Sequence, residues 1–255
     1  MKQNKEIFSD KEKQQHNDLV ISYLALRKYI GILGISLPII LLVGSCVANG
    51  GRLESSISDY FHTPLRQFFT IILGGMSLLL FAYKGYTQLD KWMTNMAGFF
   101  GLLTAFVFTS FDNHAKLHGY TIALDHHREI IVPIQEQCVI IPNPVGILQS
   151  TLHLVFAALF FLSLAYMSGK QFVKGDPKNK NHVMGEKKVP ENRIYKICAW
   201  IIVFTILALV PAAIPGKSQD FYTENKLVFF GEVICLWAFG LSWLIKGIDL
   251  EKQNS

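Results

Sequence analysis

Apolar residues occur along the chain in long runs that charged residues rarely interrupt. A helix needs about 20 apolar residues to cross the hydrocarbon core of a bilayer, and it satisfies its own backbone hydrogen bonds there. The pattern therefore predicts an all-α polytopic membrane protein, built as a single bundle of six transmembrane helices. The predicted spans are residues 29–47, 64–83, 92–111, 145–167, 197–214 and 227–245.

The composition favours a membrane protein over a soluble enzyme. Hydrophobic residues make up 51% of the 255 positions and charged residues only 17%, whereas soluble domains carry about 25% charged residues. The four cysteines lack the C-x-x-C spacing of a zinc or redox site. The basic N-terminal segment lacks the short apolar core of a cleaved signal peptide, so we expect it to be retained.

The distribution of Lys and Arg predicts the orientation of the six spans. Eighteen of the 24 basic residues fall in the tails and loops of one side, and six fall on the other. Because cytoplasmic segments retain positive charge, both termini are expected in the cytoplasm. The formal net charge of +5 then reflects topology and contact with anionic membrane lipids, and it requires no nucleic-acid partner.

Two long connections separate the predicted spans. Residues 112–144 form a 33-residue extracytoplasmic loop or cap, in which the runs TIAL and EIIVPI around DHHR predict a β-hairpin. Residues 168–194 form a polar, lysine-rich cytoplasmic linker. Cys46 and Cys138 fall in the same oxidising compartment, which leaves both a disulfide and two free thiols open.

Three ionisable residues lie within the predicted spans, where such residues usually serve function. They are Arg66, His153 and Glu232. At 1.5 Å per residue, His153 lies roughly 12 Å and Glu232 roughly 7 Å from the outer end of its helix. Because lipid does not solvate these groups, we expect His153 and Glu232 to line one cavity at the outer face, together with His62 from the segment above.

The residue types of this cavity suggest a metal-dependent hydrolytic site. Histidine and carboxylate side chains suit zinc, and three protein ligands with a water make a catalytic zinc site. The predicted metal ligands are His62, His153 and Glu232, and the predicted catalytic residues are Asp112, His153 and Glu232. A divalent metal such as zinc is the candidate cofactor.

Three polar residues near the start of the second span are predicted to bind the ligand. They are Ser58, Asp59 and Arg66. A structural role for Arg66 is the alternative, because an unpaired guanidinium below the headgroups is costly. In that role Arg66 would form an ion pair with Glu232 or Asp112 and hold the bundle together.

Three segments of the chain resemble a family of six-span bacterial integral membrane proteins whose function is not established. The segments are SISDYFHTPLRQFF, LHLVFAALFFLSLAY and GEVICLWAFGLSWLIKG. The resemblance implies a multi-pass protein of the bacterial inner membrane, with polar family positions at His62, Arg66, His153 and Glu232. A more distant similarity is to the membrane hydrolases that include alkaline ceramidases, which hold zinc but have seven spans and an HxxxH pair.

Two functions fit these observations. The first is binding, or metal-dependent hydrolysis, of a lipid or small amphiphile at the outer leaflet. The second is a proton- or ion-coupled transporter or membrane sensor that uses His153 and Glu232. The sequence contains no G-x-S-x-G, H-E-x-x-H or P-loop motif that would decide between them. Neither the oligomeric state nor the substrate follows from the sequence.

Overall fold

The protein is a bundle of long helices, as expected for a membrane protein. The computed structural model describes residues 2–48, 51–83, 85, 87–107, 120–125, 128–133, 139–141, 147–173, 189–214 and 216–254. Among these described residues, four helical stretches are long and apolar enough to cross a membrane: Leu24–Ala48, Thr151–Gln171, Asn192–Ala213 and Leu227–Ile248.

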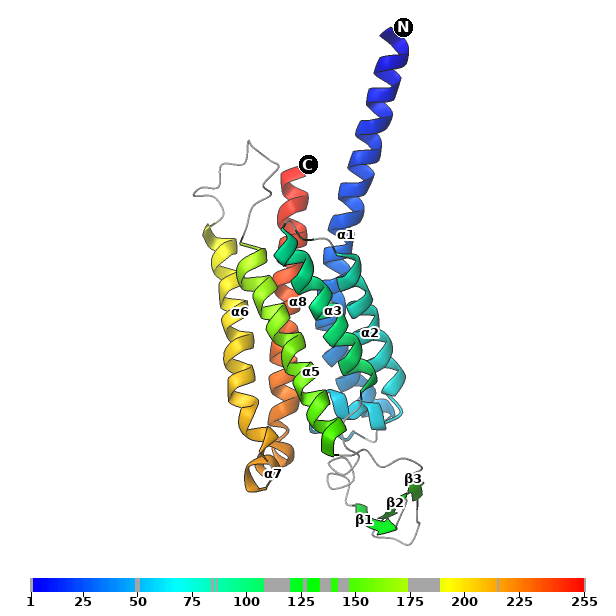
Figure 1. Cartoon of the computed structure of the whole chain (residues 1–255), viewed down its shortest axis with the longest axis vertical. Helices are drawn as coiled ribbons and strands as arrows, with labels where there is room; N and C mark the ends of the chain where they lie inside the picture. The colour runs from blue at the N-terminus through cyan, green and yellow to red at the C-terminus, as the bar shows by residue number, and fades with distance from the viewer. Residues whose placement is uncertain are drawn as a thin grey trace.

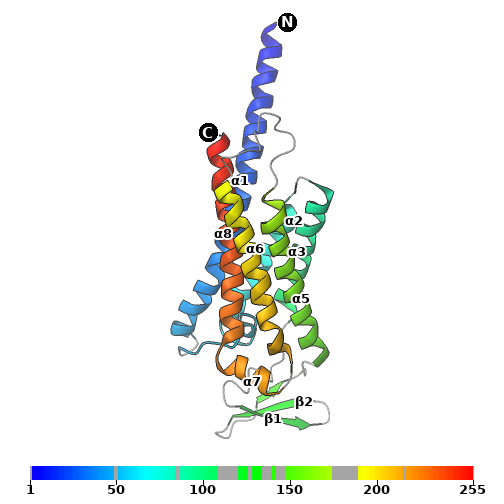
Figure 2. The ribbon, with the colours of Figure 1, turned by 90° about the vertical axis from the view of Figure 1, so that its left-hand side faces the viewer.

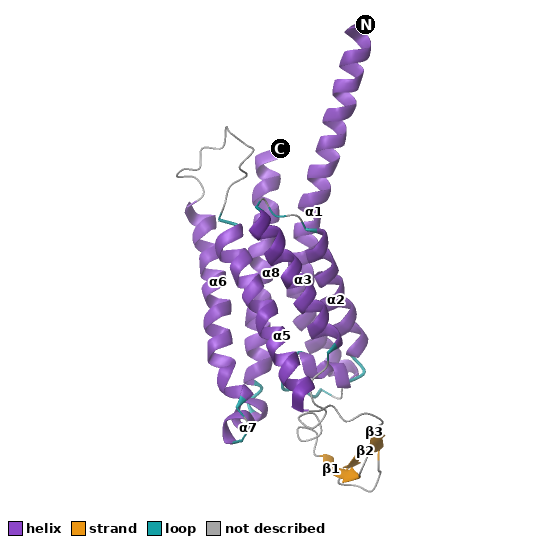
Figure 3. Cartoon of the chain, in the orientation of Figure 1, coloured by secondary structure: helices purple, strands orange, loops and turns teal. Residues whose placement is uncertain are grey.

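In the described part of the chain, six long helices run alternately up and down the bundle (Figure 1). They are α1 (Lys2–Ala48), α2 (Arg66–Ala82), α3 (Gln88–Phe106), α5 (Ile147–Tyr166), α6 (Val189–Leu209) and α8 (Leu227–Asn254). Both chain termini lie at one end of the bundle, which we call the terminal end. The short helix α7 (Lys217–Glu224) and three short strands lie at the other end, which we call the β end (Figure 3).

The helices α2 and α3 are not among the four long apolar stretches. Helix α2 has only 17 residues. The first turn of α3 is polar, because Thr87 and Asp90 form a capping box in which each side chain accepts the other's backbone N–H. This cap begins α3 at Gln88, before the predicted span 92–111, and α3 ends at Phe106. The prediction of six spans therefore stays a prediction for these two helices.

The six long helices close a ring. Helix α1 packs against α2, α2 against α3, α3 against α5, α5 against α6, α6 against α8, and α8 against α1. Figure 2, turned by 90°, shows the helices aligned along one common axis. The interior of the ring therefore receives side chains from helices that are far apart in the sequence.

Glycines allow the backbones of α1 and α8 to approach closely. A Cβ atom at Gly240 would lie 2.8 Å from the Gly31 carbonyl oxygen and 2.7 Å from Ile35 Cγ1. Small residues at helix contacts permit such approaches and increase the van der Waals contact between membrane helices. This contact brings the first and last long helices together and closes the ring.

Alanine at Gly240 is expected to lower the stability of the bundle by roughly 1–3 kcal/mol, the usual cost of overpacking a close contact. Gly74 in α2 is the matched control, because a Cβ there meets nothing within 4 Å. Gly74→Ala should be neutral or slightly stabilising, since alanine has the higher helix propensity. Unfolding temperatures of the purified proteins in detergent measure both effects, and equal temperatures would contradict the packing argument.

Three short strands lie at the β end, within the predicted loop or cap at 112–144. They are β1 (Tyr120–Asp125), β2 (Arg128–Pro133) and β3 (Val139–Ile141). Strand β1 pairs antiparallel with β2, with Thr121 opposite Val132, and β2 pairs antiparallel with β3. Residues 126 and 127, at the centre of the predicted hairpin turn, lie outside the described residues.

The predicted linker at 168–194 is shorter in the structure. Helix α5 continues into a π-helical turn at Met167–Gln171, in which Ser168 and Gln171 are buried. Helix α6 begins at Val189 with proline in its first turn, where a missing N–H costs nothing. Cys46 is an exposed free thiol, whereas Cys138 lies outside the described residues.

Candidate functional site

The segment between α1 and α2 folds inward at the β end and carries much of the candidate site. Residues Glu54 to Tyr60 are all buried although most of them are polar. The segment is held partly by α8, whose Phe229 N–H donates to the Ser55 carbonyl at 2.9 Å. This N–H belongs to the first turn of α8, which supplies it with no helical partner. The polar segment and the first turn of α8 therefore satisfy each other's backbone hydrogen-bonding groups.

Tyr60 ties the same segment to α1. Its hydroxyl lies 2.6 Å from Ser45 Oγ. Because Ser45 Oγ donates to the Leu41 carbonyl at 2.8 Å, the Tyr60 hydroxyl must be the donor to Ser45. Burial raises the pKa of Tyr60, which keeps the phenol protonated for this bond. The inward fold of the segment is thus fixed from two helices.

Two consecutive residues of the segment, Ile57 and Ser58, bond to two of the three ionisable side chains that the sequence places within spans. The Ile57 N–H donates to Glu232 Oε2 at 2.6 Å. Ser58 Oγ lies 2.7 Å from His153 Nε2. His153 is only 1% exposed. His153 on α5 and Glu232 on α8 therefore meet the same short stretch of chain.

The hydrogen bonds of His153 fix its tautomer. Its Nδ1 bonds the carbonyl oxygen of Val107, at the end of α3. A carbonyl only accepts, so Nδ1 carries the proton, and in the neutral imidazole Nε2 is then the acceptor. Ser58 O–H must accordingly donate to Nε2. This is a serine hydroxyl on a histidine base whose ring is oriented by a third group.

Asp59 supplies negative charge beside this pair. Its carboxylate accepts the Ser55 hydroxyl, and its backbone N–H donates to Ser56 Oγ at 3.1 Å. It is also close enough to His153 and Glu232 to interact electrostatically with both. An anion near the imidazole stabilises its protonated form.

Lys226, at the start of α8, is a cation close to the buried acids Glu54 and Asp59. Burial lowers the pKa of Lys226, and the nearby Glu54 and Asp59 carboxylates oppose this shift. Its backbone has a positive φ of 56°, which a non-glycine residue adopts only where surrounding contacts hold it. Lys226 therefore offsets part of the negative charge of the buried segment.

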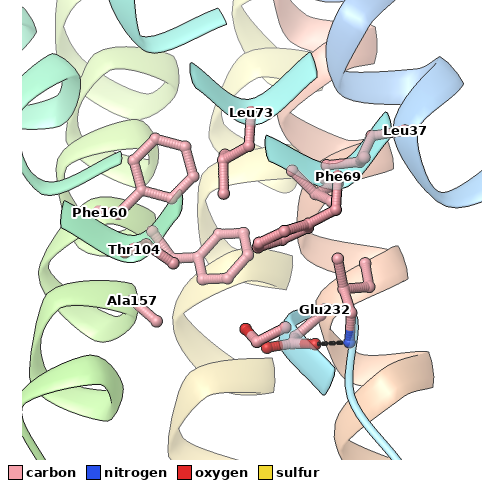
Figure 4. A pocket seen from close by; sticks show the side chains of 11 residues that line it. Leu37, Phe69, Leu73, Thr104, Ala157, Phe160 and Glu232 are labelled. Atoms are coloured by element: carbon pink, nitrogen blue, oxygen red, sulfur yellow. Dashed lines mark hydrogen bonds between the residues drawn. The ribbon is translucent and has the colours of Figure 1, made fainter. Parts of the chain in front are cut away.

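A small cavity lies on the axis of the ring beside Ser58 and Glu232. Its volume of about 20 Å³ is sufficient for about one water molecule. Its walls are mostly apolar, and Figure 4 shows Glu232 on one side of it with Phe69, Leu73 and Phe160 on the other. The dashed line marks the bond from Glu232 to the Ile57 N–H. The remaining lining residues are Leu37, Ile57, Ser58, Thr104, Ala157, Phe161 and Leu236.

The predicted cavity of His62, His153 and Glu232 is only partly formed. Glu232 lines it, His153 reaches it through Ser58, and His62 is not among its lining residues. His62 ends the 3₁₀ turn Ser58–His62, which repeats every three residues. Four positions after Ser58, it points roughly 120° away, and its ring packs edge-on against Phe61 at 5.7 Å between centroids.

The predicted pairing of Arg66 with Glu232 is wrong. Arg66 is exposed, and its guanidinium lies 4.1 Å from the centroid of the Phe61 ring. The Glu232 carboxylate bonds instead to the Ile57 backbone. Sequence position gives the depth of Arg66 but not the side of α2 on which it lies. The alternative partner Asp112, also predicted to be catalytic, lies outside the described residues.

The predicted three-ligand metal site is not assembled by the described residues. Among them, no three His, Cys, Asp or Glu side chains are grouped so that they could hold a metal ion. The physical reason is that both ring nitrogens of His153 are engaged, with Val107 and Ser58, while His62 points elsewhere. Of the predicted binding residues, Ser58 and Asp59 lie in the site and Arg66 does not.

Among the described residues, three buried charges toward the terminal end are not singled out by the sequence pattern, namely Arg27, Asp90 and Lys246. Each lies one or two positions outside a predicted span, because a search for uncharged runs ends at the first charge. Helices α1 and α8 continue well past these positions. A helix that extends beyond its apolar run would have indicated these buried charges.

Comparison of the chain with models of protein families, with curated proteins and with solved structures finds no match. The resemblance to six-span bacterial membrane proteins therefore stays a prediction.

Proposed function

We propose that this membrane protein is an acyl hydrolase that uses Ser58 as nucleophile and His153 as general base. The observation that carries the proposal is the 2.7 Å contact between Ser58 Oγ and His153 Nε2, with Nδ1 held by the Val107 carbonyl. A nucleophile, a base and a group that orients the base are the recurring elements of serine hydrolases. The proposal keeps hydrolysis from the sequence analysis but replaces metal activation with a serine.

The chemistry follows from the roles of the two side chains. Ser58 Oγ attacks the carbonyl carbon of an ester while its proton passes to His153 Nε2. The imidazolium gives this proton to the leaving alkoxide as the C–O bond breaks, which leaves an acyl group on Ser58. A water then attacks the acyl carbon, its proton passes through Nε2 to Ser58 Oγ, and the carboxylic acid leaves. The Val107 carbonyl and Asp59 favour the transient imidazolium.

The cavity indicates the class of substrate. Its apolar walls suit an acyl chain better than a polar molecule, and its volume of about 20 Å³ admits the water that deacylation requires. An acyl chain needs more room, so the helices around the cavity must separate to admit it. We therefore propose an ester of a membrane lipid or small amphiphile as substrate.

A fluorophosphonate probe tests this function, because it phosphonylates only serines that a base activates. The intact protein in detergent should take up one probe per chain, mapped by mass spectrometry to Ser58. Heat-denatured protein is the control and should take up none. Absence of labelling in folded protein, or labelling only at other serines, would contradict the hydrolase.

A second function, a proton relay, is favoured by one observation. Ser58 and Glu232 line the same cavity, and one water there would connect His153, Ser58 and Glu232 by hydrogen bonds. Such chains of ionisable groups carry protons in pumps and transporters. The alternative is therefore a proton-coupled transporter or sensor, for which proton flux into liposomes is the direct measurement.

We further propose that all six long helices span the bacterial inner membrane, with both termini in the cytoplasm. The proposal is supported by the asymmetric distribution of Lys and Arg. In a background with both Cys46→Ala and Cys138→Ala, a membrane-impermeant maleimide on intact cells should label Thr121→Cys in β1 and leave Gln14→Cys in α1 unlabelled. The reverse result would invert the orientation.

A further inference from the structure

A second group of polar side chains lies at the terminal end of the ring, opposite the site of Ser58 and His153. Arg27 on α1, Gln171 after α5 and Lys246 on α8 are all buried there. Each lies within about one helical turn of the terminal end of its span, at Leu24, Gln171 or Ile248. The group therefore lies near the depth of the lipid headgroups.

Aromatic rings join these side chains into one cluster. Arg27 donates to the Tyr83 hydroxyl at 2.6 Å, and Lys246 Nζ donates to the Phe172 carbonyl at 2.8 Å. Between them lies Trp243, whose ring packs edge-on against Tyr83 at 4.9 Å and against Phe172 at 5.1 Å between centroids. We call Arg27, Tyr83, Gln171, Trp243 and Lys246 the terminal-end cluster.

Two members of the cluster have hydrogen-bonding groups that are not used. Gln171 and Trp243 are both 0% exposed. In the described part of the chain, the Gln171 amide nitrogen, the Gln171 amide oxygen and the Trp243 Nε1 atom all lack a hydrogen-bond partner. Leaving a buried polar group unsatisfied costs roughly 1–3 kcal/mol. Three such atoms at the terminal end of the ring require an explanation, and a ligand supplies one.

A glycine allows the chain to pass close to the Gln171 amide. A Cβ atom at Gly85 would lie 2.7 Å from Gln171 Nε2. The backbone at Gly85 thus packs closely against the Gln171 amide, and a larger residue at this position would clash with it. The neighbouring acid, Asp90, is engaged in the cap of α3, where its Oδ2 accepts the Thr87 N–H.

The unused groups and the nearby charges call for an acceptor. The indole N–H of Trp243 is a donor only, and the Gln171 amide adds two more N–H groups. Arg27 and Lys246 bring two positive charges, against one negative charge from Asp90 among the described residues buried at this end. A ligand that satisfies this set carries negative charge and several acceptor oxygens. Phosphate has both and is the abundant anion at headgroup depth.

We propose that the terminal-end cluster binds a phosphate group through Gln171 and Trp243, with Arg27 and Lys246 providing the charge. The phosphate belongs either to an anionic lipid headgroup or to free phosphate. Binding here does not depend on the chemistry at Ser58, so Ser58→Ala protein should bind as wild type does. The two proposals can therefore fail separately.

The unfolding temperature of the full chain in neutral detergent measures this binding, because a ligand of the folded state raises it with concentration. The probes are dihexanoyl phosphatidic acid, inorganic phosphate and dihexanoyl phosphatidylcholine at constant ionic strength. A saturable rise is expected with at least one of the first two and not with phosphatidylcholine. A rise with phosphatidic acid alone identifies the lipid headgroup, whereas a rise with inorganic phosphate identifies the free anion.

Two variants locate the site. Trp243→Phe and Gln171→Met each remove hydrogen-bond donors and leave a large apolar side chain in their place. Each should therefore weaken the apparent affinity by about tenfold, the worth of one hydrogen bond. The matched controls are Trp237→Phe, whose indole N–H donates to the Ile35 carbonyl on an exposed face, and Gln67→Met, which is exposed. Loss of affinity in the controls as well, or in neither variant, would overturn the proposal, as would no saturable rise with either phosphate probe.

Discussion

Alanine at Ser58 is expected to abolish phosphonylation of the chain, and glutamine at His153 is expected to slow it by at least about 100-fold, the lower range for removal of a general base. Glutamine cannot take up the serine proton, although its amide can still bond to the Val107 carbonyl. The rate of probe uptake, followed by mass spectrometry of the Ser58 peptide, measures both effects.

Ser56→Ala is the matched control for these variants. Ser56 is a buried serine two positions away, and its Oγ accepts the Asp59 N–H rather than contacting a base. Its alanine variant should take up the probe at nearly the wild-type rate. Equal uptake by the Ser58→Ala and wild-type proteins would show that another residue is the nucleophile and would exclude the dyad.

Acidification should slow the same reaction. The base works only as the neutral imidazole, so the rate should fall as pH decreases through the range in which His153 becomes protonated. The rate would instead rise on acidification in a site where the imidazolium is the active form. A rate that increases toward low pH would therefore contradict the assignment of His153 as base.

The apolar runs of the sequence predict the helices well because each run is a local property. The predicted spans 145–167 and 227–245 match α5 at Ile147–Tyr166 and the apolar part of α8, which begins at Leu227. The predicted span ends are wrong where a charged residue lies inside a continuous helix. Arg27 and Lys246 lie in continuous helices whose buried sides face the ring, and hydropathy alone cannot distinguish a buried charge from the end of a span.

In the candidate site, too, the sequence predicts local properties and misses those that depend on tertiary packing. Depth along each helix correctly brings His153 and Glu232 to one end of the bundle. Their actual partners, Ser58 and Ile57, depend on how the segment between α1 and α2 folds inward, which is a tertiary property. The rotation of α2, which takes Arg66 away from the site, is likewise fixed only by packing.

Leucine at Glu232 is expected to slow probe uptake by Ser58 roughly 10- to 100-fold, because an unsatisfied buried N–H costs about 1–3 kcal/mol. The Ile57 N–H, which donates to Glu232 Oε2 at 2.6 Å, would lose its acceptor, and Ser58 is the next residue. Glu232 is thus a positioning residue in the hydrolase. Glutamine at the same position keeps an acceptor oxygen, so Glu232→Gln should restore uptake to within a few-fold of wild type.

The glutamine variant also separates the hydrolase from the proton relay. A relay needs a group that gains and loses a proton, and an amide cannot do so at neutral pH. In the relay, Glu232→Gln should therefore abolish proton flux into liposomes, whereas Glu224→Gln on the exposed face of α7 should leave it unchanged. Probe uptake by Ser58 that is retained in Glu232→Gln but lost in Glu232→Leu supports the hydrolase. Flux that is lost with glutamine, in a protein whose Ser58 never reacts with the probe, assigns Glu232 to proton transfer instead.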